Sequence, residues 1–99
     1  MKIARLLFHA TDPENVPSIM KDGLKAPVYM MNGLGTIEAI ERGIAKQTDY
    51  KGGNQVLLQI RLPNDWPLFR DEASETDQYV KSLKSIPSKY IEIHNRRWP

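Results

Sequence analysis

Hydrophobic and polar residues alternate at the start of the sequence, from Lys2 to His9. A period of two is typical of a β-strand, because successive side chains of a strand point to opposite faces of the sheet. One face of the expected strand carries Ile3, Arg5, Leu7 and His9, and the other carries Ala4, Leu6 and Phe8. We therefore expect a first strand that ends at His9.

The apolar spacing becomes helical after the segment TDPEN, which is rich in turn and capping residues. The residues at helical spacing are Val16, Ile19, Met20 and Leu24. We expect Asn15 or Asp12 to cap this helix by accepting hydrogen bonds from its first free amides. Gly23 is expected to end it, because glycine readily adopts the left-handed conformation that follows many helices.

Later segments predict one more helix and several strands. Residues 28–31 are expected to form a short strand, and Thr36 to cap a second helix whose apolar stripe is Ile37, Ile40 and Ile44. Further strands are expected over residues 78–82 and 91–95, joined at a corner by Pro87. Because the helices come early and most of the strands later, this order predicts an α+β fold.

The clearest strand pattern spans residues 55–62, and we expect this strand to lie mid-sheet. It places Val56, Leu58, Ile60 and Leu62 inward and Gln55, Gln59 and Arg61 outward. In the irregular stretch that follows, the residues expected to cover the core are Trp66, Leu68 and Phe69. Residues 70–76 are polar and acidic and are expected to form a solvated connection.

The composition indicates one domain over residues 1–99, with 40% hydrophobic and 26% charged residues. The sequence has no cysteine, which excludes disulfides and thiolate metal sites and favours a reducing, cytoplasmic location. It has no run of about 18 apolar residues, so no membrane span is expected. The net charge of +2 is a mild basic tilt, without the dense basic stripe that is typical of nucleic-acid-binding proteins.

Familiar catalytic motifs are missing: the sequence has no P-loop, no GxGxxG, no GxSxG and no HExxH. The two histidines, His9 and His94, fall in separate expected strands, which is not a metal-ligand pattern. From the residues alone, His9 is either a structural residue or a functional imidazole held at a strand end beside a cleft. Thr11 is either a helix-capping hydroxyl or part of the same site. Tyr29 alternates with apolar neighbours and is by default a core residue.

Four segments, in order and spanning nearly the whole chain, resemble the ADP-ribosyltransferase superfamily. LLFHATDPENVPSIMKDGL is similar to a first strand that delivers a His-x-Thr and a short helix that ends in Gly-Leu. VYMMNGLGTIEAIERG resembles the family's second strand and next helix, QVLLQIRLP its central strand, and QYVKSLKSIPSKYIEI its closing hairpin. The likeness is to the DNA-targeting ADP-ribosyltransferase toxins and the RNA 2′-phosphotransferase-like branch. It implies a small split β-sandwich with two short helices.

The resemblance also implies a site for NAD. In it His9 would hydrogen-bond the NAD ribose, Thr11 would support this contact, and Tyr29 would stack on the nicotinamide ring. Where the family has a catalytic acid, at the start of the penultimate strand, this chain has Gln78 with Asp77 beside it. Because neighbouring strand residues face opposite ways, only one of the two can face the cleft, and Glu75 shares the side of Asp77.

The function that the resemblance implies is NAD-dependent transfer of ADP-ribose to a macromolecular acceptor, a protein or a nucleic acid. A carboxylate at the ribose would stabilise the positive charge that develops there as the nicotinamide leaves. Gln78 carries no charge, so the alternative is a catalytically inactive module that binds NAD, ADP-ribose or a protein partner. We expect no metal and no membrane association, and the small size favours a toxin or phage setting.

Overall fold

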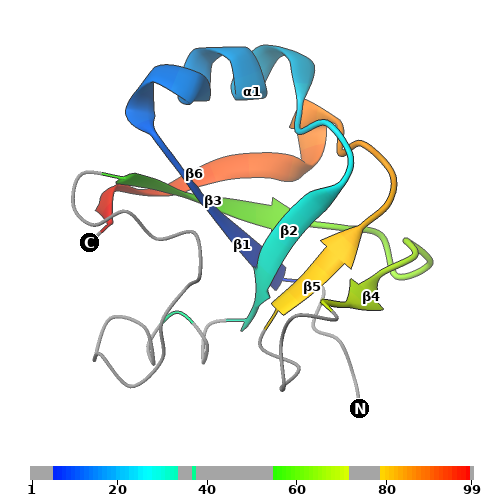
Figure 1. The fold of residues 1–99 in the computed structure, drawn as a ribbon. Helices are drawn as coiled ribbons and strands as arrows, with labels where there is room; N and C mark the ends of the chain where they lie inside the picture. The colour runs from blue at the N-terminus through cyan, green and yellow to red at the C-terminus, as the bar shows by residue number, and fades with distance from the viewer. Residues whose placement is uncertain (1–5, 34–36, 38–54, 72–78, 99) are drawn as a thin grey trace.

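The structure, a computed structural model, describes residues 6–33, 37, 55–71 and 79–98 (Figure 1). Its strands are β1 (Leu6–Thr11), β2 (Val28–Asn32), β3 (Gln55–Arg61), β4 (Phe69–Arg70), β5 (Tyr79–Ser82) and β6 (Ile91–Trp98). Within these residues the helices are the α-helix α1 (Val16–Asp22) and two short 3-10 helices, η1 (Pro13–Asn15) and η2 (Ser88–Tyr90). The strands form one six-stranded sheet in the order β4-β5-β2-β1-β3-β6, with neighbouring strands antiparallel.

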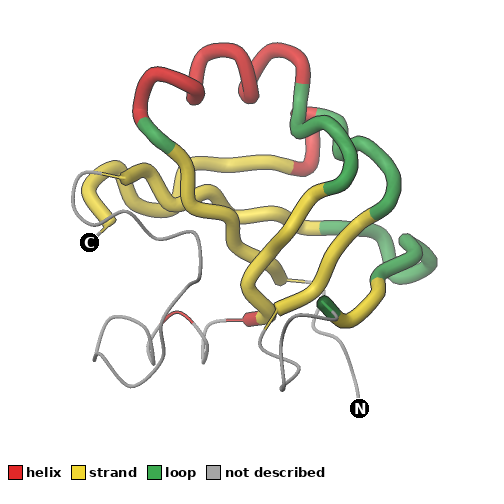
Figure 2. Tube along the Cα trace, viewed as in Figure 1, coloured by secondary structure: helices red, strands yellow, loops and turns green. Residues whose placement is uncertain are grey.

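Helix α1 covers one face of the sheet, so helix and strands form two layers (Figure 2). Its buried residues Val16 and Ile19 pack into a cluster with inward side chains of the strands, which include Leu7, Val28, Met30, Val56, Leu58, Ile60, Val80 and Ile91. A smaller cluster on the other face contains Phe8, Ala10, Met31, Ile37 and Leu57. A helix on one face of an antiparallel sheet is an α+β arrangement, which confirms the predicted fold class.

Strand β3 lies between β1 and β6, as expected of the clearest strand in the sequence. Its predicted inward residues, Val56, Leu58, Ile60 and Leu62, all belong to the cluster beneath α1. The prediction that Gln55 faces outward is wrong, because this side chain is only 6% exposed. Leu57 on the same side of β3 is fully buried, so both faces of the strand are covered there.

Strand β1 continues past His9, where the sequence pattern placed its end. Its pairing with β3 runs on through His9 and Leu58 to Thr11 and Val56. The side-chain caps expected before α1 are also absent, since neither Asp12 nor Asn15 makes a side-chain cap hydrogen bond. Pro13 is the first residue of η1 and Pro17 the second residue of α1. Proline is tolerated at such positions because its missing N–H would have no partner within the helix. Gly23 follows the helix with a φ of 82°, as predicted.

The stretch after β3 differs from its prediction at one aromatic residue. Trp66 and Leu68 pack against the core as expected. Phe69 does not, because it forms the short edge strand β4 and is 46% exposed. Of the expected second helix the structure describes Ile37, which is buried, and the rest lies outside the described residues.

Candidate functional site

Strands β1 and β2 stay together over only a short distance. They pair at Leu7 with Asn32 and at Phe8 with Met31, and the ladder then stops. Beyond this point β1 continues to pair with β3, whereas β2 pairs with β5 back to Val28. In Figure 1 the two strands meet at their paired ends and separate toward α1. The sheet therefore opens between its two central strands, directly after Phe8.

His9 occupies the first position of this opening. Its Nδ1 lies 2.8 Å from the carbonyl oxygen of Tyr29 on β2, so a side chain links the two strands where backbone pairing ends. A carbonyl oxygen can only accept, so Nδ1 carries the hydrogen and donates it. In the neutral imidazole Nε2 is then the acceptor nitrogen. The hydrogen bond therefore fixes both the orientation and the tautomer of His9.

A cleft of about 410 Å³ lies between β1, α1 and the turn that follows α1. The residues that line it are His9, Thr11, Asn15, Ser18, Ile19, Asp22, Gly23, Leu24 and Lys25. Its volume falls within the range of about 300–1,000 Å³ that is usual for small-molecule sites. Most of its side chains are hydrogen-bonding groups, so the cleft suits a polar ligand with hydroxyl or phosphate groups.

Thr11 is the second predicted residue in this cleft. It is 7% exposed, and its Oγ1 accepts a hydrogen bond of 3.3 Å from Asn15 Nδ2. This bond ties the end of β1 to the residue before α1. The N-cap residues of η1 and α1 are Asp12 and Asn15, so Thr11 does not hold the capping position that the sequence allowed. The structure thus places His9 and Thr11 two residues apart on the same side of β1, at one cleft.

The far wall of the cleft is anchored to a distant part of the chain. Leu24 and Ile86 exchange two backbone hydrogen bonds, of 2.9 Å from Leu24 N to Ile86 O and 2.8 Å in return. Gly23 lies so close to this segment that a Cβ atom there would overlap the Ile86 carbonyl oxygen. Residues 22–25 are therefore held in place by the turn that precedes η2.

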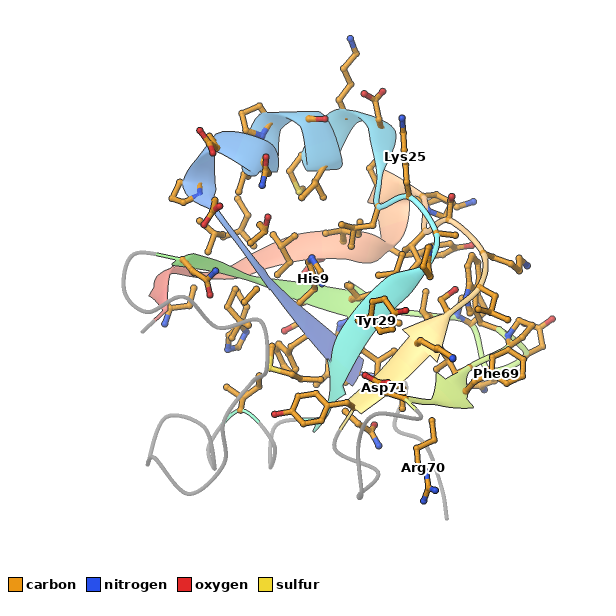
Figure 3. The ribbon with its side chains drawn as sticks, viewed as in Figure 1. His9, Lys25, Tyr29, Phe69, Arg70 and Asp71 are labelled. Carbon is orange, nitrogen blue, oxygen red and sulfur yellow. The ribbon has the colours of Figure 1, made fainter. Side chains whose placement is uncertain are left out.

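Tyr29 takes a different position from the one that its apolar neighbours predicted. Its side chain is 47% exposed rather than buried in the core. Tyr29 is not among the described residues that line the cleft, although its carbonyl holds His9. Figure 3 shows Tyr29 on β2 beside His9 on β1. Its backbone, and not its ring, belongs to the geometry of the cleft.

The predicted acidic or amide residues Glu75, Asp77 and Gln78 lie outside the described residues. The structure does describe Tyr79, with which β5 begins. Tyr79 pairs with Met31 on β2, and Met31 pairs in turn with Phe8 on β1. Only strand β2 therefore lies between Tyr79, at the described start of β5, and Phe8, the residue that precedes His9. Burial raises the pKa of Tyr79, because desolvation disfavours its phenolate.

Four polar residues of the cleft were not predicted as site residues: Asn15, Ser18, Asp22 and Lys25, of which Asn15 was expected only as a helix cap. The first three are spaced by three and four residues, which places them along one side of a helical segment. This stripe runs beside the apolar stripe that carries Val16 and Ile19. A search for polar as well as apolar helical periodicity would have found it.

The second histidine lies away from the cleft. The ring of His94 on β6 meets Phe8 edge-on, at 5.1 Å between ring centroids, and Phe8 points to the sheet face opposite to that of His9. Within the described part of the chain, no three potential metal ligands of the His, Asp or Glu type gather at one place. In the same part, no helix has the length and apolar character needed to cross a membrane.

Comparison with known proteins adds no family to this geometry. The chain matches no protein-family model, and no curated protein in the comparison is significantly similar to it.

Proposed function

We propose that the cleft binds NAD and that the chain transfers ADP-ribose from NAD to a macromolecular acceptor, a protein or a nucleic acid. The observation that carries this proposal is the position of His9. Its imidazole is fixed by the Tyr29 carbonyl at the opening between β1 and β2 and lines a polar cleft together with Thr11. The order of the four segments that resemble ADP-ribosyltransferases supports the same reading. The proposal entails a split β-sandwich of that family, and the early separation of β1 from β2 is compatible with it.

The proposed reaction exchanges one bond at C1′ of the nicotinamide ribose. The bond from C1′ to the nicotinamide nitrogen breaks, and the nicotinamide leaves with the electron pair. A nucleophilic atom of the acceptor forms the new bond to C1′ and gives up its proton. Because positive charge develops on the ribose, a carboxylate beside it stabilises the transition state more than the ground state.

The residues of the chain take distinct parts in this proposal. His9 Nε2 accepts a hydrogen bond from a ribose hydroxyl, and Thr11 holds the end of β1 that presents His9. Tyr29 positions His9 through its carbonyl, since its ring is not among the described residues of the cleft. Asp77 or Gln78 contacts the ribose, as the resemblance implies. The volume of the cleft suits the part of NAD around one ribose, with the remainder of the dinucleotide along the surface.

A second candidate function is NAD or ADP-ribose binding without turnover. The residue in favour of it is Gln78, because an amide can hydrogen-bond the ribose but carries no charge. A charge-assisted hydrogen bond exceeds a neutral one by roughly 1–2 kcal/mol, which corresponds to about 5- to 30-fold in rate. The two candidates share the binding site and differ only in chemistry.

The direct test combines calorimetric titration with NAD and an assay for nicotinamide release from labelled NAD in a cell lysate. Binding together with label transfer supports the transferase. A fall in transfer of about 5- to 30-fold in Asp77→Asn, or of about 2- to 13-fold in Gln78→Ala, identifies the residue at the ribose. Binding without release of nicotinamide supports the second candidate. If NAD and ADP-ribose both fail to bind, both functions are wrong.

His9 can be tested without disturbing the link between the strands. His9→Asn keeps a donor N–H in the place of Nδ1, so the hydrogen bond to the Tyr29 carbonyl is retained while Nε2 is removed. We expect the melting temperature to stay near that of wild type and the Kd for NAD to rise about 2- to 13-fold, the value of one neutral hydrogen bond. Met20→Ala, at an exposed residue of α1 outside the cleft, is the control and should leave both unchanged. Equal affinity of His9→Asn and wild type would remove His9 from the site.

A further inference from the structure

Three polar side chains meet on the face of the sheet opposite to α1. Gln59 on β3 pairs directly with Phe8 on β1, which belongs to the core cluster of that face, and directly paired residues point to the same side. Arg61 follows two residues later in β3 and therefore points the same way. His94 on β6 reaches the same place, because its ring meets Phe8 edge-on. We call Gln59, Arg61 and His94 the Gln59 relay.

The imidazole of the relay lies at an irregularity of β6. Leu57 of β3 pairs with Asn95, whereas the next residue, Leu58, pairs with Ile93, so His94 is an extra residue in its strand. A bulge of this kind re-aims a side chain, and β6 lies at an edge of the described sheet, where bulges are common. The side chain of His94 is exposed, so protons from the solvent reach its ring.

The amide of Gln59 can face its two neighbours in two ways, which differ by a half-turn. In one orientation Oε1 lies 3.2 Å from His94 Nδ1, and Nε2 faces the guanidinium of Arg61, so that two donors oppose each other. In the other, Nε2 donates to His94 Nδ1 at 3.2 Å, and Oε1 accepts from Arg61 Nε at 3.1 Å and from Nη2 at 3.3 Å. Only the second orientation satisfies both neighbours. It requires Nδ1 to accept a hydrogen bond, which a neutral imidazole can do and an imidazolium cannot.

We propose that the Gln59 relay is a proton-operated switch, in which a proton that His94 Nδ1 takes up from solvent turns the Gln59 amide and releases Arg61. Once protonated, Nδ1 is a donor and needs Oε1 as its acceptor. Because His94 and Arg61 face opposite ends of the amide, the oxygen then leaves both nitrogens of Arg61. An imidazole changes charge between about pH 5 and 8, so the switch operates in that range. This proposal does not depend on NAD, and its test uses neither the cleft nor the turnover of NAD.

Among the described side chains, the charged groups that face His94 come from β3 and β6. Arg61 lies on β3, Glu92 lies on β6 as the direct partner of Gln59, and β1 contributes the uncharged Phe8. Glu92 is exposed and is the diagonal neighbour of Arg61 across the two strands, a separation that long side chains can bridge. A released Arg61 therefore has a second acceptor within reach. The carboxylate of Glu92 also offsets the charge that His94 gains in acid.

The experiment measures, by NMR, how much more slowly the Arg61 Nε–H exchanges with water than the same group of an unstructured arginine peptide. It is done at about pH 7.5 and at about pH 5, where an imidazole is mostly neutral and mostly charged. At the higher pH we expect wild type to exchange about 2- to 13-fold more slowly than Gln59→Leu, the value of one hydrogen bond. At the lower pH the two proteins should exchange equally. The nitrogen chemical shifts of the neutral His94 ring should place its hydrogen on Nε2.

Gln59→Glu is the matched control, because a carboxylate has an acceptor oxygen for each neighbour and does not need to turn. It should protect the Arg61 Nε–H from exchange at both pH values. His94→Phe has no titrating nitrogen and should do the same, and circular dichroism should show all variants folded. The proposal is wrong if the protection of Arg61 in wild type is the same at both pH values, or if wild type and Gln59→Leu exchange equally at the higher pH. It is also wrong if the neutral His94 ring carries its hydrogen on Nδ1.

Discussion

Replacing Gly23 with alanine tests how the wall of the cleft is built. Gly23 has a φ of 82° and a ψ of −169°, a region of backbone conformation that only glycine occupies readily. A Cβ atom there would also overlap the Ile86 carbonyl oxygen, which accepts the hydrogen bond from Leu24 N. The substitution must therefore change the backbone angles, move residues 86–88, or do both.

The magnitude follows from these two effects. Holding alanine in such a conformation costs about 1–3 kcal/mol. Separating Leu24 from Ile86 removes up to two backbone hydrogen bonds, each with a net value of about 0.5–1.5 kcal/mol. With both hydrogen bonds lost, we expect Gly23→Ala to lower the free energy of unfolding by about 2–6 kcal/mol. For a domain of this size the melting temperature then falls by at least about 8 °C.

The measurement is urea unfolding followed by circular dichroism, repeated as a thermal melt. Lys21→Ala is the control, because Lys21 is exposed on α1 and such surface changes stay within about 0.5 kcal/mol. A second readout is NAD affinity, which should fall together with stability because residues 22–25 form one wall of the cleft. If the free energies of unfolding of Gly23→Ala and wild type agree within about 0.5 kcal/mol, the close approach of Gly23 to Ile86 does not exist in solution.

Two further predictions concern other groups. Ser82→Ala should lower the free energy of unfolding in urea by about 1–3 kcal/mol, because the buried Ser82 Oγ accepts from Trp66 Nε1 at 2.9 Å and donates to the Lys84 carbonyl at 2.7 Å. Ser82→Thr keeps the hydroxyl and should lower the free energy of unfolding by less. An equal decrease in both variants would show that packing alone matters. Because burial raises the folded-state pKa of Tyr79, its contribution to stability should be complete below about pH 10 and lost as the pH rises through that raised pKa. Tyr79→Phe should lack this part of the alkaline decline in unfolding free energy. Identical profiles of unfolding free energy against pH for Tyr79→Phe and wild type would contradict the assignment.

The local sequence pattern was enough to predict those elements that do not depend on contacts with distant parts of the chain. The alternation around residues 55–62, the helical spacing of Val16 and Ile19, and the stop at Gly23 were all confirmed, because each depends on residues close together in sequence. The burial of Gln55 could not be predicted, since it depends on what covers the second face of β3. Phe69 was misplaced for a similar reason: a two-residue strand has no period to detect, and only its pairing with Lys81 defines it.

The candidate site shows the same division. The sequence singled out both His9 and Thr11 near the end of the first strand, and the structure places both in the wall of one cleft. The bond from His9 to the Tyr29 carbonyl joins strands that are 20 residues apart in sequence, and no local pattern encodes where two strands separate. The exposure of Tyr29 was missed because its neighbours Val28 and Met30 point to the face covered by α1, whereas Tyr29 points to the opposite face of the sheet.

The order of strands in the sheet also governs when the molecule can assemble. Strand β1 lies between β2 and β3, and β3 is drawn from a part of the chain about 50 residues later. Strand β2 likewise waits for β5, about 50 residues downstream. Sheets built from such distant partners fold slowly, because loop entropy is lost before contacts compensate for it. On the ribosome the emerging amino-terminal half therefore has no stable sheet to join, and the wall formed by residues 22–25 acquires its anchor only once Ile86 has left the exit tunnel.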